Sequence, residues 1–250
     1  MHDDIQERRQ FTVSIASSVL FAGLQFHDGD RLSNFELMSG PQRLCSKGHF
    51  LSHEGEPRPD LYLLRSGWLC CSITTPAGDR QITTIHLPGD LVGMPSIARE
   101  VAAETISALT DCVVDIIPLE AFAVAFRQHP RLAALLYMSA QEERVRLIHQ
   151  LTLVGRVHSV KRMAAFLLSI YHRVRVNVAG VDDSFALPLT QQDLGDATGM
   201  SVVHANRALR ILRERGYASL QKGTLTVHDY PGLVTFAGSP ADSKRSTAWI

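Results

Sequence analysis

Residues 189–212 read Leu-Thr-Gln-Gln-Asp-Leu-Gly-Asp-Ala-Thr-Gly-Met-Ser-Val-Val-His-Ala-Asn-Arg-Ala-Leu-Arg-Ile-Leu, and this stretch decides the fold of the C-terminal part of the chain. Thr190 is placed to cap a helix, and Asp193 follows at the third helical position, as in a capping box. Gly199 comes just after this helix, where a left-handed backbone is common. Ser201 is placed to cap a second helix. Two short helices joined by a tight turn indicate a helix-turn-helix, whose second helix enters the major groove of DNA.

The composition is that of a globular protein with one large or two modest domains. The chain has 250 residues, of which 45% are hydrophobic and 20% charged. No apolar run approaches the roughly 18–20 residues that cross a bilayer, and the N-terminus lacks the layout of a signal peptide. The four cysteines show no CxxC spacing, so we expect neither a metal cluster nor a disulfide framework. A cytoplasmic protein without a membrane partner is the expectation.

The charge is unevenly divided along the chain, although its net value is zero. Residues 1–156 hold 14 Lys and Arg against 18 Asp and Glu, whereas residues 157–250 hold 11 against 7. The C-terminal third is therefore basic by four charges, which favours a nucleic-acid partner for that part.

The local patterning changes twice along the chain. Residues 1–40 carry a helical pattern, and short apolar runs separated by Gly and Pro then predict a β-barrel or jelly roll up to about residue 118. A long helix is predicted from Pro130 to about Gly155, and a further helix over Val160–Val174. A β-hairpin, or wing, follows the helix-turn-helix, and residues 237–250 form a polar tail. The strands are predicted at Leu61–Leu64, Trp68–Thr75, Gln81–Leu87, Cys112–Ile117, Ala218–Leu220 and Leu225–Val227.

A barrel, a long helix and a winged helix-turn-helix, in this order, resemble the Crp/Fnr family of bacterial transcription regulators. The resemblance covers roughly residues 30–230, through the helix-turn-helix and a glycine framework. The framework comprises Lys47-Gly48-His49-Phe50, Glu54-Gly55, Leu61–Gly67, Gly78-Asp79-Arg80 and Leu87–Gly93. The implied fold class is α+β. The expected parts are a sensor domain with a cyclic-nucleotide-binding-like barrel at 1–128, a dimerisation helix at 129–156, a winged helix-turn-helix at 157–235 and a tail at 236–250.

The resemblance places the recognition helix at Ser201–Arg213 and implies double-stranded DNA with a palindromic operator as the partner. Arg207 matches the family's base-reading arginine, whose fork fits guanine O6 and N7. Valines at 202 and 203 depart from the polar residues that the family often has there, so we expect a different half-site. The residues expected to contact DNA are Thr190, Gln191, Ser201, Val202, Val203, His204, Asn206, Arg207, Arg210 and Lys222.

The residues with which family members bind cyclic AMP are missing from the expected effector pocket. Members that bind cyclic AMP hold it with a Gly-Glu pair and an Arg-Ser pair, but here the aligned residues are Gly93 and Met94, and Ala102 and Ala103. Without a guanidinium the buried phosphate would have no partner, although Arg99 lies nearby in sequence. We therefore expect control by an effector other than cyclic AMP, and its identity stays unknown.

Several alternatives stay open. An iron–sulfur cluster is not expected, because no cysteine precedes Cys45. A regulator that responds to cyclic AMP or to haem through a divergent pocket is one alternative, with haem bound by a single histidine. A redox thiol and a metal-dependent cupin-like enzyme are others; neither catalytic residues nor a metal site is predicted. The residues that these alternatives would use are His27, His49, His53 and His86 for haem, Cys70, Cys71 and Cys112 for redox chemistry, and His49, His53 and Glu56 for a cupin-like metal.

The long helix is the expected dimer seam, because a helix of about 25 residues exceeds what a small domain needs. A two-fold dimer matches a palindromic operator, and an activator would also contact RNA polymerase. The apolar residues expected to form the seam are Leu132, Leu135, Leu136, Val145, Ile148 and Leu151.

Overall fold

The computed structural model describes residues 40–57, 60–177 and 183–238. These residues form two compact units. The first contains residues 40–71 and 85–141, and the second contains residues 72–84 together with the described residues from 142 onward. The helical pattern expected before residue 40 and the polar tail from residue 239 onward lie outside the described residues, whereas Phe236 and Ala237, which were assigned to the tail, end the last helix.

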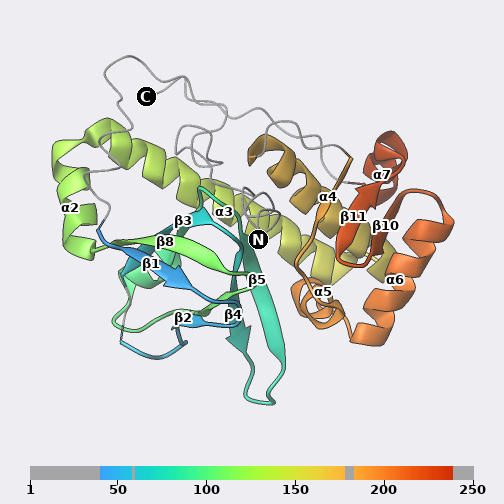
Figure 1. Cartoon of the computed structure of the whole chain (residues 1–250), viewed down its shortest axis with the longest axis horizontal. Coiled ribbons are helices and arrows are strands. Elements are labelled where there is room, and N and C mark those ends of the chain that lie inside the picture. Colours follow the sequence, from blue (N-terminus) through green and yellow to red (C-terminus); the bar gives the residue numbers. More distant parts are fainter. Residues whose placement is uncertain (1–39, 58–59, 178–182, 239–250) are drawn as a thin grey trace, which may run out of the picture. The chain divides into compact units, whose positions relative to one another are not determined.

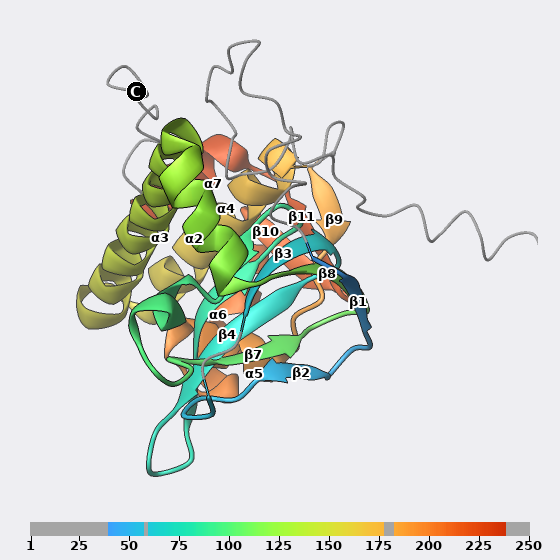
Figure 2. The same ribbon diagram turned by 90° about the vertical axis from the view of Figure 1, so that its left-hand side faces the viewer.

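Two four-stranded sheets build the barrel (Figures 1 and 2), and residues 72–84, at the adjoining ends of β4 and β5, belong to the second unit. Their strand orders are β1-β8-β3-β6 and β2-β7-β4-β5. The strands are β1 (Gln42–Cys45), β2 (Phe50–Ser52), β3 (Leu61–Ser66), β4 (Leu69–Thr74), β5 (Arg80–His86), β6 (Leu91–Val92), β7 (Thr105–Ala108) and β8 (Cys112–Ile117). The jelly-roll-like barrel is thereby confirmed, and β1, β2, β6 and β7 are strands that the patterning did not reveal.

Strand β3 lies at the centre of this unit because both of its faces are buried. Leu61 and Leu63 point into a cluster with residues of the helices that follow the barrel, whereas Tyr62 and Leu64 point into the barrel interior. This alternation follows from the two-residue period of a strand. It explains why Leu61–Leu64 is a continuous apolar run.

Glycines in the framework stand where the chain turns too sharply for other residues. Gly67 has φ +84°, and a Cβ there would lie 2.3 Å from the carbonyl oxygen of Asp111. Gly93 has φ +95° and begins the 3-10 helix η3 (Met94–Ala98). A left-handed backbone disfavours residues with a Cβ, so the framework sets the strand turns.

Helix α2 (Leu119–Gln128) leads into the 27-residue helix α3 (Pro130–Arg156), close to the predicted bounds. Leu132, Leu135 and Leu136 of α3 are buried in the core of the first unit with Phe122 of α2. Within the described residues, no helix is long and apolar enough to cross a membrane.

The second unit contains the predicted winged helix-turn-helix. Helix α4 (Ser159–Asn177) packs against α6 and α7, and β9, β10 and β11 form a sheet in the order β10-β11-β9 (Figure 1). Strand β9 and helix α7 were not predicted. The elements after α4 are β9 (Ser184–Ala186), α5 (Gln191–Thr198), α6 (Val202–Glu214), β10 (Ala218–Gln221), β11 (Thr224–Val227) and α7 (Tyr230–Ala237).

Candidate DNA-binding site

Helix α5 begins with the predicted capping box. The Thr190 hydroxyl oxygen accepts the Asp193 N–H at 3.1 Å, and the Asp193 carboxylate accepts the Thr190 N–H at 2.9 Å. Burial by itself would raise the pKa of the Asp193 carboxyl, but hydrogen bonds from Thr190 and from the guanidinium of Arg80 outweigh it and lower the pKa. The carboxylate therefore stays charged at neutral pH and satisfies the first turn of the helix.

The turn between α5 and α6 depends on two glycines and a distant arginine. Gly199 is left-handed, with φ +63°, as predicted for the end of α5. Gly195 approaches the next segment so closely that a Cβ would lie 2.6 Å from the carbonyl oxygen of Met200. Arg162 of α4 donates to the carbonyl oxygen of Thr198 at 2.9 Å. Local patterning could not reveal this contact, because the two residues are 36 positions apart.

Helix α6 has one buried and one open face. Ala205, Ala208 and Leu212 are buried on the side that packs against α4 and α5. On the open side, Val203 is 76% exposed, and Arg207 stands exposed one turn further along. Residues four apart lie on the same helix face, so these two side chains form one surface. Arg207 makes no hydrogen bond or ion pair with the residues that the structure describes.

Other residues that are predicted to contact DNA lie beside this surface and are hydrogen-bonded to one another. Asn206 donates its side-chain amide to the side-chain oxygen of Gln191 at 2.8 Å, which joins the start of α5 to α6. The Ser201 hydroxyl is 2.8 Å from Nδ1 of His204. Val202 is half-buried at the start of α6, so Val203 is the more open of the two valines. These residues lie together beside the open face of α6.

Two further predicted contacts are cations at the margins of this surface. Arg210 is exposed and has its Nε 3.7 Å from the carboxylate of Glu214, a weak surface pair. Lys222 occupies the wing turn between β10 and β11 and has φ +48°. Positive φ is uncommon for a residue with a Cβ, and the turn leaves the Lys222 side chain exposed.

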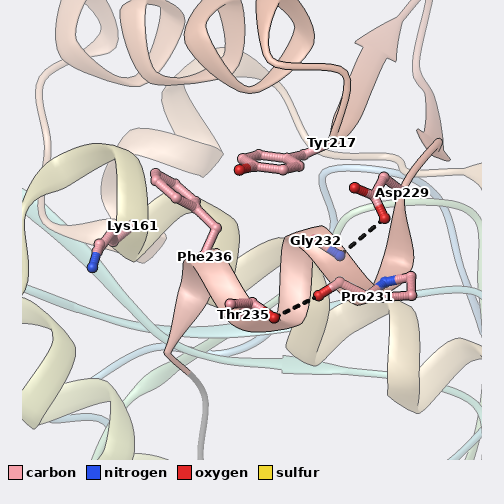
Figure 3. A pocket seen from close by; sticks show the side chains of 7 residues that line it. All are labelled: Lys161, Tyr217, Asp229, Pro231, Gly232, Thr235 and Phe236. Atoms are coloured by element: carbon pink, nitrogen blue, oxygen red, sulfur yellow. Dashed lines mark hydrogen bonds between the residues drawn. The ribbon is translucent and has the colours of Figure 1, made fainter.

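A pocket beside α7 is lined by four residues of α7 together with Lys161, Tyr217 and Asp229 (Figure 3). The Asp229 carboxylate accepts the Gly232 N–H at 2.9 Å, and the Thr235 hydroxyl donates to the Pro231 carbonyl oxygen. Phe236 stacks on the neighbouring ring of Tyr217, with ring centroids 5.2 Å apart. The two hydrogen bonds lie within α7 and its cap, and the ring stacking joins α7 to the segment before β10, so we assign the pocket a structural role.

The residues of the expected effector pocket make core contacts and backbone hydrogen bonds in this chain. Gly93 begins η3, and Met94 packs against the core cluster that contains Leu61. Ala102 is buried and bonds through its backbone to Gly55 and Glu56, while the Ala103 N–H donates to the Ser96 hydroxyl. Neither alanine can supply a guanidinium.

The histidines proposed for haem or metal have other neighbours. His49 lies 2.9 Å from a guanidinium nitrogen of Arg43, and the His53 ring stacks on Phe50. The Glu56 carboxylate accepts the backbone N–H of His53. The described residues include no group of three or more His, Cys, Asp or Glu placed to hold a metal ion. His27 lies outside the described residues.

The candidate redox cysteines are buried. Cys112 faces Cys45 across β1 and β8, and burial, reinforced by Cys45, raises the pKa of the Cys112 thiol to about 12. Cys71 is 3.4 Å from Nε2 of His86, while Cys70 is 3.2 Å from the Ser107 hydroxyl. A protonated thiol is a poor nucleophile, so Cys112 is not primed for oxidation.

The residues predicted for a dimer seam divide into two groups. Val145, Ile148 and Leu151 are exposed, and Leu151 is the most open at 74%. Leu132 and its neighbours Leu135 and Leu136 belong instead to the core of the first unit, which corrects their assignment to the seam. The apolar periodicity could not separate the two groups, because one helix carries both.

Comparisons with known proteins agree with this architecture. Residues 42–129 match the cyclic nucleotide-binding domain family, and residues 161–236 match the Crp-like helix-turn-helix domain family. The transcriptional activator protein anr of Pseudomonas aeruginosa is 28% identical over 226 residues, which cover 90% of this chain and 91% of that protein. The anaerobic regulatory protein of Pasteurella multocida is 27% identical over 210 residues, covering 84% and 76%. The structure of FixK2 from Bradyrhizobium japonicum gives a TM-score of 0.73 at 23% identity, covering 80% of this chain and 98% of FixK2.

The chain belongs to the Crp/Fnr family of transcription regulators. It is a DNA-binding regulator, and its partner is DNA. The predictions of family, fold class and DNA binding are thereby confirmed.

Proposed function

We propose that this regulator acts as a homodimer on a palindromic operator, with α6 of each copy in the major groove. The observation that carries the proposal is the open face of α6, where the exposed Arg207 guanidinium stands beside the exposed methyl groups of Val203. Both helices of the motif are capped at their first turns, so this face is held by a defined scaffold. The half-sites are expected about one helical turn of DNA apart.

In this proposal, one set of residues contacts the DNA bases and another set contacts the phosphates. Arg207 pairs with guanine O6 and N7, and Val203 contacts a thymine methyl group. Gln191 and the exposed cations Arg210 and Lys222 contact phosphates. Thr190 and Ser201 support the helix N-termini as caps, because their hydroxyl groups are already hydrogen-bonded within the motif.

The proposed dimer contact is the exposed apolar stripe of α3. At about 100° per residue, Leu147, Ile148 and Val154 lie within about 60° of Leu151 around the helix axis. Val145 lies about 120° away and thus at the flank. All five side chains are at least 37% exposed in the single chain. An apolar stripe of this kind is stabilised when a second copy covers it.

Control by an effector other than cyclic AMP is part of the proposal, since Ala102 and Ala103 cannot neutralise a cyclic phosphate. A relative bears the name of a transcriptional activator, which supports RNA polymerase as a second partner. We propose no enzymatic activity, and we place the protein in the cytoplasm, where its DNA partner would be accessible.

The test is an operator selected from random DNA, followed by binding measurements on two single variants. Arg207→Ala should weaken binding to the selected operator by about 1–3 kcal/mol and relax the preference at one base pair. Arg210→Ala is the matched control on the same helix, and it should weaken selected and random DNA alike and reduce the salt dependence. Equal weakening of both DNAs by Arg207→Ala would refute base reading.

A further inference from the structure

An arginine of the hairpin between β4 and β5 contacts the first helix of the helix-turn-helix. The tip of this hairpin, residues 72–84, belongs to the same compact unit as α5 and α6. Arg80 donates through Nε to the Asp196 carboxylate at 2.6 Å. A terminal nitrogen of its guanidinium donates to the Asp193 carboxylate at 2.5 Å. One planar guanidinium therefore bridges two carboxylates of α5.

The two carboxylates need this partner because they are buried. Asp193 is 7% exposed and Asp196 is 8% exposed. They are three positions apart, so both lie on one face of α5. Their remaining oxygens are also used: one accepts from Thr190, and the other accepts from the Gln192 amide at 2.5 Å. Loss of the guanidinium would leave two buried negative charges side by side, which is strongly unfavourable.

Amide side chains extend the same network to the other end of α5. Gln81, next to Arg80, donates to the backbone carbonyl of Asp196 at 2.5 Å. Gln150 of α3 donates to the carbonyl oxygens of Ile82 and Ala197, at 3.3 and 3.2 Å. These bonds satisfy carbonyl groups near the C-terminal end of α5, where the helix has no partners of its own. The position of α5 is thus fixed from its first turn to its last.

This network leaves the proposed DNA surface open. Thr190 and Gln191 at the start of α5 are exposed, as are Val203 and Arg207 on α6. The hairpin therefore contacts α5 away from the reading surface and does not cover it. A contact that blocked DNA would have to bury at least some of these side chains, so the geometry favours support of DNA binding over inhibition.

We propose that Arg80 is a positioning residue for DNA binding. It acts through Asp193 and Asp196, whose pairing with its guanidinium holds the N-terminus of α5 where the helix meets the phosphates. Asp193 also supplies the cap of α5, so loss of Arg80 disturbs the cap. The proposal rests on DNA binding by this helix-turn-helix, but on no contact between Arg80 and DNA.

The test measures the affinity of full-length Arg80→Ala for the selected operator at several salt concentrations, together with its melting temperature. We expect roughly tenfold weaker binding, as for the loss of a charge-assisted hydrogen bond. The slope of affinity against salt should be unchanged, because Arg80 releases no counterion from DNA. Arg43→Ala, which removes an exposed arginine of β1, is the matched control and should bind like the parent protein.

A double-mutant cycle separates positioning from a general loss of stability. Asp196→Asn removes one of the charges that Arg80 compensates, so Arg80→Ala should weaken binding less in that background than in the parent. Arg80→Lys keeps the charge without the fork and should restore binding in part. Unchanged or tighter binding by Arg80→Ala below its melting temperature would overturn the proposal, as would a salt slope reduced by about one, which indicates a direct phosphate contact. If Arg207→Ala weakens operator binding while Arg80→Ala does not, only the role of Arg80 fails.

Discussion

Replacement of Leu151 by alanine tests whether the open stripe of α3 holds two copies together. Leu151 is 74% exposed in the single chain, so about three quarters of its surface is still available for burial at an interface. Full burial of a leucine side chain stabilises by about 1.5–3 kcal/mol, which leaves roughly 1–2 kcal/mol to be gained in the dimer. A two-fold interface contains the residue twice, so its loss should weaken the dimer by about 2–4 kcal/mol.

This energy corresponds to a rise in the dimer dissociation constant of roughly 30- to 700-fold, at 1.4 kcal/mol per tenfold. Sedimentation equilibrium over a range of protein concentrations would measure the change. Val203→Ala is the matched control, because Val203 is an apolar side chain of nearly equal exposure, 76%, on α6 instead of α3. The control should leave the dimer intact.

Two results would contradict the reasoning. If Leu151→Ala and Val203→Ala leave the dissociation constant equally unchanged, the stripe is not the interface. If the parent protein is a monomer in the presence of its operator, the dimer itself is refuted. A weaker dimer should also bind the palindromic operator less tightly while single half-sites are bound normally, because the intrinsic surface of α6 is untouched.

Two further predictions concern the motif and the barrel. Gly195→Ala should lower the stability of the helix-turn-helix by more than about 1 kcal/mol, because the new Cβ would lie 2.6 Å from a backbone oxygen. Gly155→Ala in α3 is the control and should not lower stability, because a Cβ there meets nothing within 4 Å. Thermal unfolding of both variants measures the difference. Cys112 should resist alkylation by iodoacetamide at pH 8 in the folded protein but react in denaturant, as read by peptide mass spectrometry, because its folded pKa is about 12 against 9.0 for the free thiol. Because the Cys112 thiol ionises at a lower pH in the unfolded chain than in the folded protein, it lowers the free energy of unfolding as the pH rises from 9 towards 12. Rapid labelling of the native protein at pH 8 would contradict the raised pKa.

Short-range patterns in the sequence predicted the helix-turn-helix closely. The capping box of Thr190 and Asp193, and the left-handed Gly199, depend on residues within one or two turns, so the local order of residues is sufficient to identify them. Strand β8 was predicted with its observed bounds, Cys112–Ile117, because the run is apolar and lies between turn residues. The short strands β2 and β9 were missed, because three residues carry too little periodicity to stand out from a loop.

Local periodicity, turn chemistry and motif spacing predicted the order of the parts along the chain. The class of protein and the arginine on the open face of α6 were implied by the resemblance to the Crp/Fnr family that these motifs carry. Only the tertiary structure decided which leucines of α3 are buried and which are open, and that Arg80 meets Asp193 and Asp196 more than a hundred positions away. The physical reason is that burial and charge pairing depend on which segments pack together, and neither a helix period nor a lone arginine specifies its distant neighbour.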